Sequence, residues 1–176
     1  MSSVTCQISI SLDGFVAGPN QSLENPIGEG GMRLHQWLFE TDSWHKLQGH
    51  AGGAHTVDSE VVDGLFQNVG AYIMGRHMFG GGRGGTTFNF VTDGIDSALE
   101  QARLAGGAKD IVVAGGAHTV QQFIAAGLLD ELYLHIVPIV LGAGERLLEN
   151  VGDPMLKPND VIASPAVTHV RYRIGR

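Results

Sequence analysis

Apolar and polar positions alternate along the first segment of the chain. Between Val4 and Leu12 every second residue is apolar, and the positions between them are Thr, Gln and Ser. A two-residue period of this kind is typical of a strand with one buried face. The turn signal Asp13-Gly14 follows directly, so we predict a first strand over Val4–Leu12 that ends in a tight turn.

The most informative pattern lies between Lys109 and Glu149. Ile111–Ala114 is a short β-branched run, typical of a strand covered on both faces, and it ends at Gly115-Gly116. Thr119–Ala126 then has helical spacing of apolar residues, and a new alternating run begins at Leu132 and continues to about Leu141. Strand, glycine pair, helix and strand predict a parallel crossover, with free helix N–H groups that suit an anion such as a phosphate.

Weaker patterns predict the remaining elements. We expect two further helices with aromatic or branched apolar faces, a helix before the central crossover, and short strands elsewhere. They are a helix from near Met32 to about Thr41, a helix from Asp58 (as a possible cap) to about Asn68, a buried strand at Ala71–Met74, a short strand at Phe88–Val91, a helix at Ile95–Leu104 capped by Asp93 or Asp96, and strands at Val161-Ile162 and Val167–Ile174.

Two groups of side chains are candidates for binding. Gly75-Arg76-His77 leaves the end of a predicted strand, and the planar, always charged guanidinium of Arg76 suits a phosphate; a surface ion pair is the alternative. Trp37 and Phe39 lie on the first helix, where they could pack in the core or form the wall of a ligand site.

Composition narrows the class of protein. The chain has 176 residues, of which 43% are hydrophobic, so we expect one globular domain over residues 1–176. The net charge is -7 and no block of Lys or Arg occurs, which disfavours nucleic acid. The lone cysteine excludes an internal disulfide. No membrane-length apolar run and no signal-peptide pattern is present, so we expect a cytoplasmic protein without a membrane partner. The histidines lack zinc-helix spacing, and we predict no metal site.

Several motifs occur together in a recognisable order. They are Ser11–Gly18, Tyr72–Phe79, Val112–Gly116 with its helix, Asp130–Leu134, and Pro138–Leu147. In this order and spacing, over about residues 4–174, the chain resembles the dihydrofolate reductase-like superfamily. It is most similar to the branch that includes the reductase (C-terminal) domain of the bifunctional deaminase–reductases of riboflavin biosynthesis.

The resemblance implies an α/β three-layer sandwich, with a mixed, mainly parallel central sheet flanked by helices and NADPH across the carboxyl ends of its strands. It also implies a homodimer. Asp13 would be the catalytic residue and would bind or protonate a heterocycle, with a turn-forming role as the alternative. Trp37 or Phe39 would pack against the ring of this heterocycle. The resemblance further implies three sets of cofactor contacts. Gly75, Arg76 and His77 would contact the phosphates, with Arg76 at the 2′-phosphate. The pyrophosphate would be held by Gly115, Gly116, Ala117, Thr119 and Val120, and the nicotinamide would lie beside Leu12 and Val16.

The chain departs from the family pattern at two places. Ala114 stands where the riboflavin reductases commonly have Glu before the glycine pair, and only Gly80–Gly85 lies where the family has a longer segment with another strand. The main hypothesis is an NADPH-dependent reductase that transfers a hydride to a small heterocycle, either a pterin or a 5-amino-6-ribosylaminouracil-type pyrimidine. The alternative, motivated by Ala114, is a non-catalytic NADP(H)-binding or sensing module. A metal-dependent hydrolase is a third hypothesis.

Overall fold

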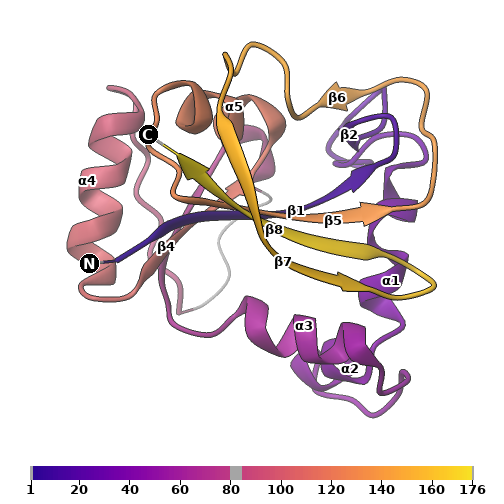
Figure 1. Cartoon of the computed structure of the whole chain (residues 1–176). Coiled ribbons are helices and arrows are strands. Elements are labelled where there is room, and N and C mark those ends of the chain that lie inside the picture. The colour runs from indigo at the N-terminus through magenta and orange to yellow at the C-terminus, as the bar shows by residue number, and fades with distance from the viewer. Residues whose placement is uncertain (1, 80–84, 176) are drawn as a thin grey trace.

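Helices cover both faces of a central sheet, as a computed structural model shows for residues 2–79 and 85–175 (Figure 1). The six-stranded sheet has the order β3-β4-β1-β5-β8-β7, and β2 and β6 form a separate two-stranded sheet. The strands are β1 (Val4–Ser11), β2 (Phe15–Ala17), β3 (Val69–Met74), β4 (Asp110–Gly115), β5 (Glu131–Val137), β6 (Glu145–Arg146), β7 (Met155–Ala163) and β8 (Thr168–Gly175).

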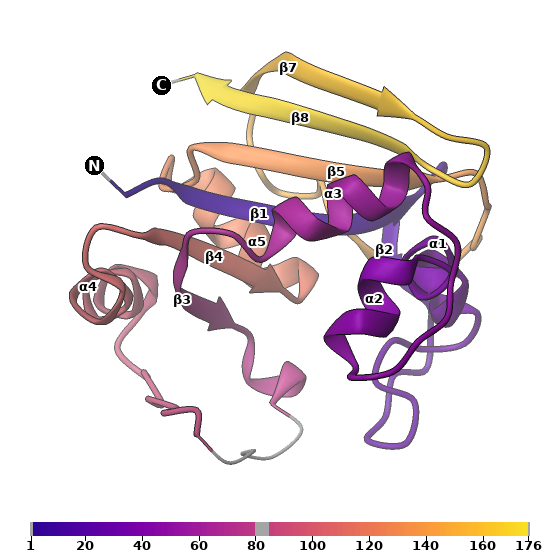
Figure 2. The same cartoon turned by 90° about the horizontal axis from the view of Figure 1, so that it is seen from below.

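The helices vary in length from one turn to three. They are the 3-10 helices η1 (Gly31–His35) and η2 (Arg76–Met78), and the α-helices α1 (Gln36–Phe39), α2 (Asp42–Leu47), α3 (Val57–Leu65), α4 (Ile95–Gly106) and α5 (Ala117–Ala125). In the view from below, α1, α2 and α3 lie on one side of the sheet, while α4 and α5 lie on the other (Figure 2).

The direction of the strands confirms a mixed, mainly parallel sheet. β1 runs parallel to both β4 and β5, and β3 runs parallel to β4. β8 pairs antiparallel with β5 and with β7. The crossover β4–α5–β5 therefore spans β1, and the carboxyl ends of β3, β4, β1 and β5 meet at one edge of the sheet.

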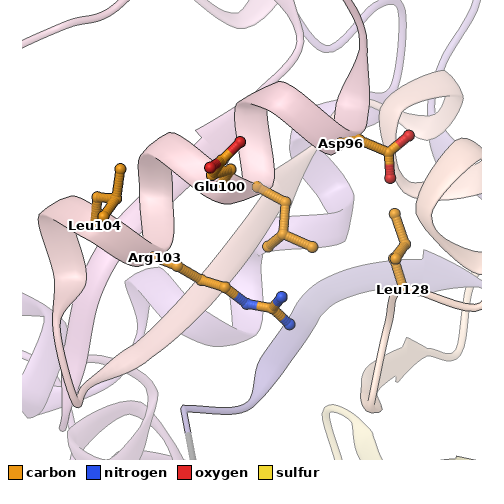
Figure 3. Close-up of a pocket in the computed structure, with 6 residues that line it drawn as sticks. Asp96, Glu100, Arg103, Leu104 and Leu128 are labelled. Atoms are coloured by element: carbon orange, nitrogen blue, oxygen red, sulfur yellow. The ribbon is translucent and has the colours of Figure 1, made fainter.

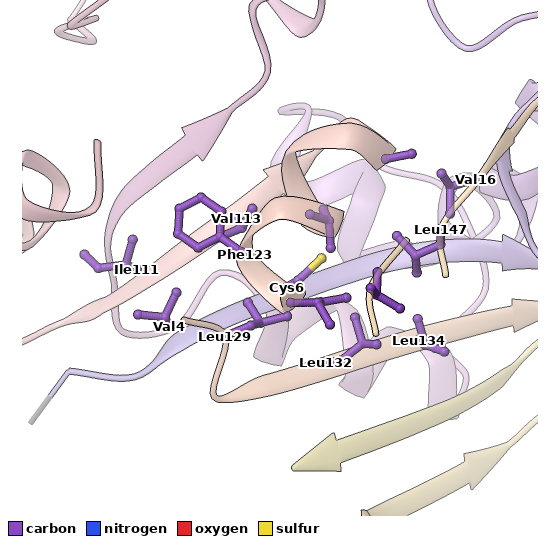
Figure 4. Close-up of a cluster of buried hydrophobic side chains, with 14 of the residues drawn as sticks. Val4, Cys6, Val16, Ile111, Val113, Phe123, Leu129, Leu132, Leu134 and Leu147 are labelled. Atoms are coloured by element: carbon purple, nitrogen blue, oxygen red, sulfur yellow. The ribbon is translucent and has the colours of Figure 1, made fainter. Parts of the chain in front are cut away.

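The larger hydrophobic core lies between the sheet and the pair α4 and α5 (Figure 4). Phe123, in the middle of α5, is fully buried there. It packs with apolar side chains of the same face of β1, β4 and β5, which are Val4, Cys6, Ile111, Val113, Leu132 and Leu134. A second, smaller core lies on the opposite face and includes Leu34, Trp37, Val62, Val137 and Val167.

Two strand predictions are wrong at the edge of the sheet. β3 is an edge strand rather than a buried one, and 46% of the Tyr72 surface is exposed. Phe88 and Phe90 lie in an irregular segment instead of a strand, and both pack edge-on against Phe79, with ring centroids 5.0 Å apart. An alternating or apolar run forms a strand only when a neighbour accepts its hydrogen bonds, which sequence pattern does not reveal. Residues 80–84, where the family pattern is shortened, lie outside the described residues.

Helix boundaries also differ from the predictions. The helix expected at 32–41 is a 3-10 turn followed by one α-turn, and α2, which has no counterpart in the predictions, follows it. The cap of α3 is Thr56 rather than Asp58. The cap of α4 is Gly94, without any side-chain cap from Asp93 or Asp96. The last strand of the central crossover stops at Val137, because Pro138 has no N–H for the ladder.

No helix in the described part of the chain is long and apolar enough to cross a membrane.

Candidate functional site

The loops that leave β3 and β4 meet at the carboxyl edge of the sheet. The Gly75 N–H donates a hydrogen bond of 2.7 Å to the Gly115 carbonyl. A Cβ added at Gly75 would lie 2.8 Å from Thr119 Oγ1, although the backbone of Gly75 has an ordinary extended conformation. The close approach of the two loops therefore requires glycine at this position, and it places two predicted anion-binding segments side by side.

Gly115 and Gly116, at the carboxyl end of β4, differ in backbone conformation and in the space around their Cα atoms. Gly115 has φ +123, and a Cβ there would lie 3.2 Å from Met78 Sδ, so both conformation and packing require glycine. Gly116, joined to it by a cis peptide bond, has φ -64 and nothing within 4 Å of an added Cβ. The open space in front of its backbone leaves room for the close approach of another molecule.

The helix that begins after Gly116 offers hydrogen-bond donors. Gly116 is the cap residue of α5, no side chain caps the helix, and no acidic residue lies in its first turn. The first N–H groups of a helix have no partner within it, and together with the helix dipole they favour an anion. This end of the helix and the open side of Gly116 form one surface.

The other residues predicted on this helix have different roles. The N–H groups of Thr119 and Val120 already donate to the Gly116 carbonyl. Val120 and Ala117 have buried side chains in the core, with 0% and 4% of their surfaces exposed. The structure does not expose the side chain of Val120, so the cofactor contact predicted for it stays a prediction without support from its exposure. Val120 anchors the helix, whereas Ala117 can contribute its backbone N–H and Thr119 its hydroxyl.

Arg76 and His77 follow Gly75 on η2 and are both exposed. Within residues 2–79 and 85–175, no carboxylate forms an ion pair with Arg76. The alternative of a surface ion pair is therefore not supported. A guanidinium without an acidic partner, next to a helix N-terminus, can bind a phosphate with both arms of its fork.

The turn after β1 holds the third group of predicted residues. Leu12 is 64% exposed at the carboxyl edge, and its N–H donates to the Ile139 carbonyl at 2.9 Å. Val16 is only 8% exposed and belongs to the main core. Its side chain packs in the core, so its predicted place beside the nicotinamide stays a prediction without support from its exposure.

Asp13 has the contacts of a structural aspartate. Its carboxylate accepts hydrogen bonds from Ser11 Oγ at 2.6 Å, Gly142 N at 2.7 Å and Leu141 N at 3.1 Å. These donors, the Ser11 hydroxyl first, lower the pKa of Asp13 to about 2, although desolvation opposes them. The carboxylate is ionised at neutral pH and has no proton to give. The structure supports the turn-forming role, and we do not retain Asp13 as a proton donor.

The aromatic residues of the first helix are divided between core and surface. Trp37 is 4% exposed, and its Nε1–H donates to Ser9 Oγ at 3.1 Å. It packs in the smaller core against His135 and His169, and its assignment as a wall of the substrate site stays a prediction. Phe39 is half-buried between His35 and Trp44, with its ring centroid 6.2 Å and 5.4 Å from theirs.

Sequence reasoning missed a buried polar chain beside Trp37. Asp58, His169 and His135 are 5%, 0% and 3% exposed. His169 Nε2 lies 3.0 Å from Asp58 Oδ1, and the Nδ1 atoms of the two histidines are 2.8 Å apart. His135 occupies an alternating position of a strand, which was the one available signal. Its partner on β8 follows only from the register of the two strands.

Two cavities lie on the side of the sheet that α4 and α5 cover. The larger, of about 330 Å³, is lined by α4 and by Leu128, beyond the carboxyl end of α5 (Figure 3). It is thus at the opposite end of α5 from Gly116, and Arg103 shares it with Asp96 and Glu100. The smaller, of about 210 Å³, lies at the turn after β1, where Ile10, Gly14, Arg146, Leu148 and Glu149 line it. It is the cavity next to the carboxyl edge.

Metal chemistry has no obvious site in the described residues. Within them, no group of three or more His, Cys, Asp or Glu side chains is arranged to hold a metal ion.

Comparison with known proteins places the chain among reductase-like folds. Residues 88–170 match the family model of the RibD C-terminal domain. The uncharacterized protein YyaP of Bacillus subtilis (strain 168) is 26% identical over 156 residues, which cover 84% of this chain and 81% of that protein.

Two solved structures illustrate the likeness of fold. A putative riboflavin biosynthesis protein from Shewanella sp. PV-4 superposes with a TM-score of 0.64 at 20% identity, covering 99% of both chains. Dihydrofolate reductase from Enterococcus faecalis, in a complex with NADP(H), gives 0.52 at 10% identity, covering 99% of this chain and 97% of that one. The resemblance to the dihydrofolate reductase-like superfamily and the predicted fold class are confirmed.

Proposed function

We propose that this chain, with its dihydrofolate reductase-like fold, is an NADPH-dependent reductase that transfers a hydride to a small heterocycle of the pterin or pyrimidine type. The observation that carries the proposal is Gly116. Its open surroundings leave room for the close approach of a ligand, directly at an uncapped helix end. The match to the RibD C-terminal domain and the NADP(H) complex of the Enterococcus faecalis enzyme support a nicotinamide cofactor.

Each part of the carboxyl edge would have a separate task. The N–H groups at the start of α5 would hold the pyrophosphate, and Gly75 would keep the neighbouring loop close enough for both loops to share it. Arg76 would bind the 2′-phosphate. The exposed side chain of Leu12, beside the smaller cavity, would border the nicotinamide. The cofactor supplies the hydride when bound, and the protein positions the two reactants.

Replacing Arg76 with alanine tests this assignment. We expect the affinity for NADPH to fall by about tenfold or more, because a hydrogen bond to a charged group contributes about 1.5–3 kcal/mol. The affinity for NADH, which lacks the 2′-phosphate, should stay within about twofold. Isothermal titration of both nucleotides into the wild type and the variant measures the two effects.

Arg103→Ala is the matched control, because this arginine lies in the larger cavity at the other end of α5. It should leave both affinities unchanged. Equal losses of NADPH and NADH binding in the Arg76 variant would contradict the assignment of its guanidinium to the 2′-phosphate.

A non-catalytic NADP(H)-binding or sensing module is the second candidate. Ala114 motivates it, and the hydrogen-bonded, ionised carboxylate of Asp13 adds a second reason, because neither residue can supply a proton to a substrate. This candidate differs from the reductase in one expected result. The protein binds NADPH, but the addition of a pterin, a pyrimidine or a quinone does not lead to oxidation of the NADPH. A homodimer remains a prediction from the family resemblance, and a cytoplasmic location remains a prediction from the sequence pattern.

A further inference from the structure

The buried chain Asp58–His169–His135 links three elements on the face of the sheet opposite α5. His135 on β5 and His169 on β8 are directly opposite in the register of the two strands. Asp58 belongs to the first turn of α3, and its carboxylate reaches the far nitrogen of His169. All three side chains are more than nine-tenths buried. Such a chain has a definite direction, because each member fixes the proton position of the next.

The Asp58 carboxylate determines which nitrogen donates in each hydrogen bond of this chain. An ionised carboxylate only accepts hydrogen bonds, so the Nε2 atom of His169 carries the proton of that contact. In a neutral ring the other nitrogen, Nδ1, is then an acceptor. His135 must donate to it from its own Nδ1, and this leaves the His135 Nε2 atom with a lone pair.

Burial favours these neutral rings. Desolvation lowers the pKa of His135 to about 3, and electrostatic interactions with His169, Arg171 and His35 act in the same direction. Desolvation also lowers the pKa of His169, although Asp58 opposes this effect. Both imidazoles are therefore uncharged at neutral pH, as the direction of the chain requires.

The last nitrogen of the Asp58–His169–His135 hydrogen-bond chain has no partner in the part of the protein that the structure describes. His135 Nε2 is buried and has no hydrogen-bond partner among the described residues, and the same is true of His35 Nδ1. Burial lowers the pKa of His35, and an interaction with the Gly31 backbone opposes this effect. Buried polar atoms in native proteins nearly always have a partner. An acceptor held in a fixed tautomer, with no donor at hydrogen-bond geometry among the described residues, is available to a donor group of a bound ligand.

The location of this acceptor suits a substrate. His135 is two residues from the end of β5, beside Ser9 on β1, and so lies near the carboxyl edge of the sheet. Trp37, on the one-turn helix α1, covers it with a ring-centroid distance of 4.9 Å. A ligand could reach the nitrogen only if Trp37 moved together with η1 and α1, which are short and follow a glycine with φ +71.

We propose that His135 Nε2 accepts a hydrogen bond from a ring N–H of the substrate heterocycle, with Asp58 and His169 as positioning residues that fix its tautomer. The inference rests on the proposed reductase function and narrows its substrate to heterocycles with an unsubstituted lactam or imide N–H. Pterins and uracil-type pyrimidines both have such a group.

Two ligands and two variants test the proposal. 5,6-Diaminouracil has ring N–H groups, and its 1,3-dimethyl derivative has none but keeps the carbonyl and amino groups. Binding of each to the NADPH-loaded protein is measured by calorimetry. His135→Asn keeps an atom at the Nδ1 position for His169 and removes the free acceptor, whereas His135→Gln keeps a polar atom at the Nε2 position.

We expect the wild type to prefer 5,6-diaminouracil over its dimethyl derivative by about tenfold or more, as one hydrogen bond allows. The preference should fall about tenfold in His135→Asn and be largely kept in His135→Gln. His135→Gln, which is closer to histidine in size, controls for the steric effect of the methyl groups. Asp58→Asn should also lower the preference, because an amide can donate to His169 and no longer fixes the tautomer.

The outcomes separate this proposal from the reductase function itself. An unchanged preference in His135→Asn, equal binding of both ligands by the wild type, or no binding of diaminouracil to the NADPH-loaded protein would overturn the proposal. Equal binding would mean that the nitrogen serves an internal water. Failure of NADPH to bind in the first titration would instead count against the proposed function.

Discussion

Gly116→Ala is expected to weaken NADPH binding by about a hundredfold or more while leaving the protein folded. A methyl group at this position enters the open space in front of the α5 N-terminus and keeps the pyrophosphate away from the helix N–H groups. Loss of two hydrogen bonds to a charged group, at about 1.5–3 kcal/mol each, gives this magnitude. The titration is calorimetric, with thermal unfolding of the free protein measured in parallel.

The fold should tolerate the methyl group, because Gly116 has φ -64 and an added Cβ meets no atom within 4 Å outside its two chain neighbours. Gly64 in α3 is the matched control, since an added Cβ there also meets nothing. Gly64→Ala should leave NADPH affinity unchanged. If Gly116→Ala bound NADPH like the wild type, the glycine would have no role in binding, and the cofactor would have to lie elsewhere.

Phe123→Ala is expected to lower the free energy of unfolding by about 3–5 kcal/mol, the range found when a large buried aromatic side chain is removed. Phe123 is completely buried between α5 and the sheet, and its loss leaves a cavity that closely packed neighbours on β1 and β4 cannot fill. Because domains of this size are stable by only about 5–15 kcal/mol, the loss is severe. Urea unfolding followed by circular dichroism measures it.

Leu104→Ala provides the comparison, since this apolar side chain on α4 is 79% exposed. Its effect should stay within about 0.5 kcal/mol. A loss below about 1 kcal/mol for Phe123→Ala would mean that α5 is not held by this core. The helix N-terminus would then have no rigid support at the carboxyl edge.

The central crossover could be predicted from the sequence because its signals are local. A β-branched run, a glycine pair and a helical spacing of apolar residues each depend on a few neighbouring residues. The structure has β4, α5 and β5 in this order, with α5 beginning at Ala117 two residues earlier than expected. The exposed position of Arg76 after β3 could be predicted for the same reason, since its strand, glycine and positive charge are contiguous, and its role in binding stays a prediction.

The features that could not be predicted concern residues whose surroundings are set by distant parts of the chain. Trp37 has helical spacing, but only the packing of α1 on the sheet shows that its ring is covered. Asp13 looks the same in the sequence whether it meets a substrate or, as here, the backbone of Leu141 and Gly142. The pair His135 and His169 depends on strand register, which no local pattern contains.

The central claim is that NADPH lies where the loops after β3 and β4 meet. Peptide-resolved hydrogen–deuterium exchange, with and without saturating NADPH, tests this location directly. We expect slower exchange in the peptides that contain Gly75–Met78 and the start of α5 at Ala117, because bound phosphates would engage their N–H groups. We expect no change around Leu128, at the larger cavity. Protection at Leu128 and α4 alone, or no protection at the two loops, would contradict the account.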